Sequence, residues 1–65
     1  MMSNRTNAAG IATNLVDLIR NNARIETNVA GINANSNNIS TNAADISTNS
    51  ASISTNMFSL MANVD

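Results

Sequence analysis

Asparagine recurs at every seventh position along most of this 65-residue chain. From Asn14 onward, an aliphatic residue stands three positions before each of these asparagines, so the spacing between the two series alternates between three and four. This alternation is the heptad pattern abcdefg of an α-helical coiled coil, in which positions a and d face the partner helices. The repeat therefore predicts a helix that buries one narrow face against other helices.

The order of the spacings fixes the heptad register. An aliphatic residue is followed by asparagine after three residues and that asparagine by the next aliphatic residue after four, which matches the steps a to d and d to a. The aliphatic residues at position a are Ile11, Leu18, Ile25, Ile32, Ile39, Ile46, Ile53 and Leu60. A strict period of seven also predicts a left-handed supercoil.

Composition divides the chain into three segments. Residues 1–10 are polar, and we expect this N-terminal segment to be partly frayed. Residues 11–63 form the predicted coiled-coil stalk, in which 39–56 are an almost perfect repeat, and residues 64–65 are the C-terminal end. Because no proline interrupts the pattern, we expect one helix from about Thr6 to about Asn63.

The short length of the chain points to oligomerisation. A chain of this size builds only a small core by itself and commonly needs a disulfide, a metal or a partner subunit. The sequence has no cysteine and no histidine, which excludes disulfides and the usual zinc sites. Asparagine, serine and threonine each cost a helix about 0.5 kcal/mol relative to alanine, so a lone helix is expected to be unstable. Folding and association should therefore be one event.

The asparagines at position d bear on the number of chains. Parallel dimers favour leucine at d, and this chain has none there. A trimer has a wider axial space, in which three carboxamides can form a hydrogen-bonded ring or direct their donors at an anion or a water. We therefore predict an all-α fold, with a single long helix per chain forming a parallel, left-handed homotrimeric coiled coil. A dimer or a tetramer is the alternative.

Composition also argues against several classes of function. A net charge of −1 with 11% charged residues lacks the basic character of nucleic-acid-binding proteins. No apolar run approaches the ~18 residues of a membrane span, so we expect no membrane insertion. Without histidine or cysteine, no evident base could activate the many hydroxyl groups. We expect a protein that is not an enzyme, with no catalytic residue and no metal ligand.

The repeated Ile-Ser-Thr-Asn motif at 39–42, 46–49 and 53–56 is similar to sequences in a known class of proteins. Over about 11–63 the chain resembles the trimeric coiled-coil stalks of trimeric autotransporter adhesins and similar segments of phage tail fibres and whiskers. The resemblance implies a parallel homotrimer with chloride or other anions on its axis, and no other cofactor. The anion-binding candidates that it implies, all at position d, are Asn14, Asn21, Asn28, Asn35, Asn42, Asn49 and Asn56.

The same resemblance implies a structural role. The chain would be a stalk or spacer of a surface fibre on a virion or a bacterial cell, with itself and flanking fibre domains as partners. The alternative is a soluble oligomerisation module that joins other domains and is not surface-exposed. A β-solenoid or ice-binding protein is a third interpretation, but β-helix repeats have periods of six or nine. The apolar residues of 57–64 either dock a following domain or widen the hydrophobic seam.

Overall fold

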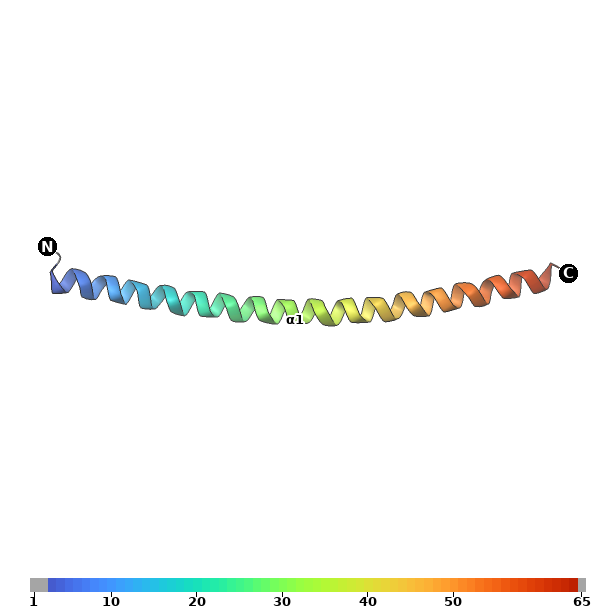
Figure 1. The fold of residues 1–65 in the computed structure, drawn as a ribbon, viewed down its shortest axis with the longest axis horizontal. Coiled ribbons are helices and arrows are strands. Elements are labelled where there is room, and N and C mark those ends of the chain that lie inside the picture. The colour runs from blue at the N-terminus through green and yellow to red at the C-terminus, as the bar shows by residue number, and fades with distance from the viewer. Residues whose placement is uncertain (1–2, 65) are drawn as a thin grey trace. The chain divides into compact units, whose positions relative to one another are not determined.

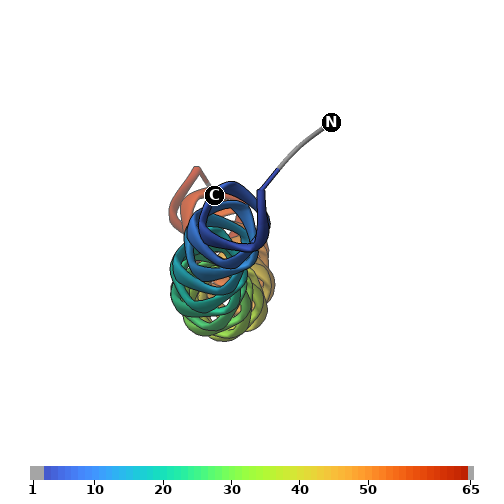
Figure 2. The ribbon, with the colours of Figure 1, turned by 90° about the vertical axis from the view of Figure 1, so that its left-hand side faces the viewer.

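The chain folds as a single α-helix. A computed structural model describes residues 3–64, and the only secondary-structure element in this range is the 60-residue helix α1 (Asn4–Asn63) (Figure 1). The view turned by 90° likewise shows coiled ribbon and no strand in the described part (Figure 2). The prediction of an all-α fold with one long helix per chain is confirmed. The β-solenoid interpretation is wrong for the described residues.

The N-terminus of α1 is capped by Ser3. The Ser3 Oγ accepts a hydrogen bond from the backbone N–H of Thr6 at 3.2 Å and lies 3.0 Å from the Thr6 hydroxyl. The backbone N–H of Asn7 donates to the Ser3 carbonyl oxygen at 3.0 Å. A serine at this position satisfies a backbone donor that the first helical turn leaves without a partner. The helix consequently begins at Asn4, two residues before the predicted start. Fraying of 1–10 in solution stays a prediction, and residues 1–2 lie outside the described range.

No irregularity of the backbone shifts the heptad phase along α1. Among the described residues there is no cis peptide bond and no residue with a positive φ angle. The helix ends at Asn63, Val64 lies in a turn, and Asp65 is outside the described range. The register deduced from the sequence can therefore be applied without a break from the first aliphatic a position to the last.

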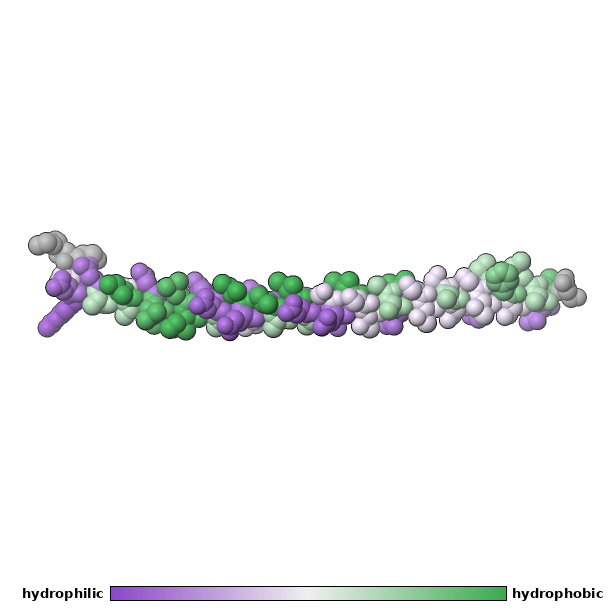
Figure 3. All heavy atoms as spheres, turned by 60° about the horizontal axis from the view of Figure 1, so that its bottom comes forward, coloured by the Kyte–Doolittle hydropathy of each residue, from purple (hydrophilic) through white to green (hydrophobic). Residues whose placement is uncertain are grey.

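The chain divides into two units, Met1–Ile32 and Asn33–Asp65, which differ in surface composition. The first unit contains all three arginines, whereas the large hydrophobic residues outside position a are divided equally between the two units within residues 3–64. On the face shown in Figure 3, strongly apolar and strongly polar side chains lie next to each other in this unit. In the second unit, pale side chains of intermediate hydropathy cover much of the visible surface, and apolar side chains gather again near its C-terminal end.

Residues 3–64 of a single chain form no hydrophobic core. Every residue from 3 to 64 is exposed, and the large hydrophobic side chains retain between 44% and 85% of their accessible surface. Within the described range, α1 contacts no other part of the chain. Burial of apolar surface is the main driving force of folding, and this fold does not supply it within one chain.

The two glycines of α1 give a first testable prediction. Both have ordinary helical backbone, and apart from the adjacent residues and the surrounding helix backbone, a Cβ added at Gly10 or Gly31 would meet no atom within 4 Å. Gly31→Ala should therefore stabilise the helix by about 1 kcal/mol per chain, because alanine loses less backbone entropy on folding. Thermal unfolding followed by circular dichroism measures this gain. Gly10→Ala is the comparison, and its gain should be smaller if residues 1–10 fray. A lower melting temperature for Gly31→Ala would indicate that a neighbouring chain approaches position 31 closely.

Candidate self-association surface

The aliphatic residues at position a form an unpartnered hydrophobic stripe. All eight are exposed, with between 57% and 69% of their accessible surface free. They recur every two turns of α1, so they stay on nearly one face and drift around the helix by ~20° per heptad. An exposed apolar face of this kind on an isolated helix suggests self-association or binding to a partner.

The asparagines at position d lie beside this stripe, and all seven candidates are exposed. Within residues 3–64 none of their side-chain amides makes a hydrogen bond to another group of the chain. Thr27, the residue before Asn28, makes no hydrogen bond to the Asn28 side chain, and its hydroxyl donates to the Ala23 carbonyl oxygen at 3.0 Å. Each of these amides therefore keeps two donors and an acceptor for groups outside its own chain. The anion sites themselves stay a prediction.

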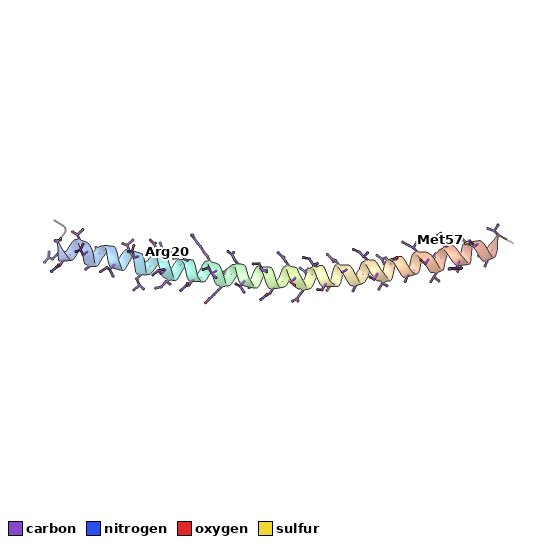
Figure 4. The ribbon with its side chains drawn as sticks, viewed as in Figure 1. Arg20 and Met57 are labelled. Carbon is purple, nitrogen blue, oxygen red and sulfur yellow. The ribbon has the colours of Figure 1, made fainter. Side chains whose placement is uncertain are left out.

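Side chains project outward along the whole ribbon, and Figure 4 labels one from each unit, Arg20 and Met57. Arg20 occupies position c, which lies away from the predicted seam. The charged residues Asp17 and Arg24 stand three positions before it and four positions after it in the sequence. Met57 occupies position e, next to the seam, and is 57% exposed. Arg20 thus adds charge on the side of α1 away from the apolar stripe, whereas Met57 adds apolar surface next to the predicted seam.

Two apolar clusters extend beyond positions a and d, one in each unit. The N-terminal collar consists of Leu15, Val16 and Ile19, and the C-terminal collar of Met57, Phe58 and Met61. In both collars the three residues stand at positions e, f and b, and all six side chains are exposed. These residues were recognisable in the sequence as additional apolar positions. Their common register is visible only once the heptad frame is applied to both ends.

The described part of the chain shows no enclosed chemical site. No pocket is present among residues 3–64, and no three histidine, cysteine, aspartate or glutamate side chains there come together as metal ligands. The Asp and Glu residues are spread along α1, from Asp17 in the first unit to Asp45 in the second. In this range, side chains of one kind gather along the apolar stripe with its collars and along the row of asparagines at position d.

The helix also lacks the hydropathy of a membrane span: in the described range, no stretch of α1 is apolar enough over the length that a bilayer crossing requires. Comparison of the chain with known proteins gives no match to a family model, to a curated protein or to a solved structure. The features of the described residues that bear on function are the helix and its unpartnered apolar face.

Proposed function

We propose that this chain is the stalk of a surface fibre, in which three parallel copies of α1 wind around one another as a coiled coil. The observation that carries the proposal is the stripe of eight aliphatic residues at heptad spacing, all exposed on a helix that has no core of its own. Packing of these residues around a common axis supplies the apolar burial that a single chain lacks. The resemblance to the stalks of adhesins and phage fibres supports the same arrangement.

Three chains suit the polar half of the seam better than two. Asparagine at position d leaves no leucine layer of the kind that favours a parallel dimer. Around a threefold axis, three amides can each donate to a neighbour and accept from another. A buried amide without partners costs about 1–3 kcal/mol, so every asparagine layer must be satisfied for the bundle to be stable. Parallel chains in register provide this, because they place asparagine next to asparagine in each layer.

Anions on the axis are a second way to satisfy the same layers. Each amide nitrogen has two N–H donors, and those of three chains can point at one chloride ion. In the single chain these amides make no hydrogen bond to another group within residues 3–64. The Thr27 hydroxyl donates its hydrogen bond to the Ala23 carbonyl oxygen and not to Asn28. Any anion that binds only the assembled chains stabilises the assembly in proportion to the logarithm of its concentration.

A spacer role fits the rest of the surface. Outside the seam and the collars, most residues of 33–56 are alanine, serine, threonine or asparagine, which offer few strong contacts to a ligand. We propose that the bundle acts mechanically, without catalysis, and holds flanking fibre domains at a distance from a virion or a bacterial cell. In this role the length of the repeat matters more than the chemistry of its outer face.

Sedimentation equilibrium tests the assembly and the anions together. The chain has a mass of 6.8 kDa, and we expect a species of three chain masses in sodium chloride. Exchange of chloride for gluconate at equal ionic strength should weaken the trimer if anions occupy the asparagine layers. If the exchange leaves the trimer unchanged, the proposed stalk stands. Water molecules or rings of amides, and not anions, would then satisfy the asparagine layers. A monomer or a dimer would contradict the proposal.

A further inference from the structure

The outer face of the proposed bundle is free of large hydrophobic side chains except at two places. Positions b and f point away from the axis of a coiled coil. From residue 9 to residue 61 these positions hold alanine, serine, asparagine and glutamate, apart from four large hydrophobic residues. These are Val16, Ile19, Phe58 and Met61, which are 44%, 60%, 73% and 67% exposed. Association of three chains through a and d leaves all four side chains on the surface.

The two collars are related by a shift of six heptads. Leu15, Val16 and Ile19 become Met57, Phe58 and Met61 under this shift, at the same positions e, f and b. The a residues within the two collars correspond as well, and they are the only leucines at position a, namely Leu18 and Leu60. The chain thus carries the same kind of outward apolar cluster twice, at a defined interval in its repeat.

In a bundle of three chains, the interval of six heptads determines where the two collars of each chain lie around the common axis. A seam with period seven on an α-helix makes each chain turn around the common axis by ~20° per heptad, or roughly 120° over six heptads. This is also the angle between neighbouring chains of a trimer. In the proposed bundle, the C-terminal collar of one chain therefore lies on the same side as the N-terminal collar of a neighbouring chain. The six collars form three columns parallel to the axis, which they would not do in a dimer.

We infer that these columns are docking sites for a second copy of the bundle, which lies alongside the first in the opposite direction. The inference rests on the proposed three-chain stalk. A partner that covers both collars of a column at once must repeat the interval of six heptads, and this chain itself carries that interval. A contact of this kind is two-fold symmetric, so each N-terminal collar meets a C-terminal collar at both ends.

Charge selects the antiparallel orientation. Glu26 is the one charged residue at positions b and f between the collars. In a parallel copy in register, Glu26 would face its own equivalent, and like charges in direct opposition are destabilising. In the antiparallel copy Val16 lies opposite Met61 and Ile19 opposite Phe58. Continuation of this pairing places Glu26 opposite Ala51.

Sedimentation velocity across a wide range of concentration tests the docking. We expect the wild-type chain to populate species of six or more chains at high concentration. The variant with Val16→Ser, Ile19→Ser, Phe58→Ser and Met61→Ser should stop at three chains and keep the wild-type helical signal. The matched control carries four serines at other b and f positions, Ala9→Ser, Ala12→Ser, Ala30→Ser and Ala44→Ser, and should assemble like the wild type.

The outcomes separate this inference from the proposed stalk. A wild-type chain that remains trimeric at all concentrations would overturn the docking and leave the stalk intact. A collar variant that no longer forms trimers would also overturn it, because the collars would then belong to the seam. A wild-type monomer would overturn both proposals.

Cysteine cross-linking tests the orientation, since the chain has no cysteine of its own. Ala23 at position f and Ser54 at position b flank the two collars and lie opposite each other in the antiparallel contact. Mild oxidation of a mixture of the Ala23→Cys and Ser54→Cys chains should give mainly the mixed disulfide. Disulfides that join like to like, 23 to 23 and 54 to 54, would show parallel docking and overturn the antiparallel arrangement. In the collar variant the mixed disulfide should fall to a small fraction of this yield.

Discussion

Ile39→Ser together with Ile46→Ser should abolish the helix at micromolar concentrations of the chain. Each buried isoleucine contributes about 2 kcal/mol, so two layers of a three-chain bundle lose on the order of 10 kcal/mol. The single chain cannot compensate for this loss, because it buries no apolar side chain within residues 3–64. Circular dichroism at 222 nm and sedimentation equilibrium of the same samples measure the effect.

The control places a similar change outside the seam. Ala44 and Ala51 both stand at position f, so Ala44→Ser with Ala51→Ser introduces two serines without touching a seam residue. This variant should keep the helical signal and the trimer mass. If the isoleucine variant also kept both, the stripe at position a would not be the surface through which the chains associate.

Asn42→Ile together with Asn49→Ile should have a large effect in the opposite direction. Polar layers in the seam of a coiled coil cost stability in exchange for a defined register and number of chains. An apolar layer removes this cost, and we expect the melting temperature to rise by about 10 °C or more. Thermal unfolding followed by circular dichroism at one fixed chain concentration measures the change, because the melting temperature of an assembly depends on concentration.

Asn37→Ile is the matched control for Asn42→Ile. It makes the same chemical change at position f, on the outer face of the bundle, and should leave the melting temperature nearly unchanged. A fall in the melting temperature of the Asn42→Ile and Asn49→Ile chain would show that the asparagine layers contribute net stability. The ring of amides, with or without an anion, would then be a source of stability as well as of specificity.

The helix was predictable because its signal is repeated many times. The alternation of Ile39, Asn42 and Ile46 continues through the chain without a proline, and the structure contains the single helix that this pattern predicts. The start at Asn4 was missed because the polar composition of 1–10 outweighed the capping signal of one serine. Ser3 and Thr6 stand at the spacing of an N-terminal cap, so the signal was present in the sequence.

The heptad position of each candidate site residue follows from the sequence, whereas the chemistry of the site does not. Position in the heptad follows from spacing alone, which is why Asn28 and Asn35 could be assigned to one face. The number of chains depends on small free-energy differences between assemblies that share the same seam, and periodicity does not contain these differences. Occupancy of the axis by an ion depends in turn on how closely three amides approach one another, which is a property of the assembly.

The absence of a core among residues 3–64 of one chain has a consequence for mixed populations of chains. In the proposed three-chain bundle the folding free energy belongs to the assembly, so a defective chain would disable its partners when it joined them. If a cell made equal amounts of wild-type chain and a seam variant that still entered trimers at random, only about one bundle in eight would be free of the variant. Lesions in the seam would therefore behave as dominant traits, whereas a variant too damaged to associate would be recessive.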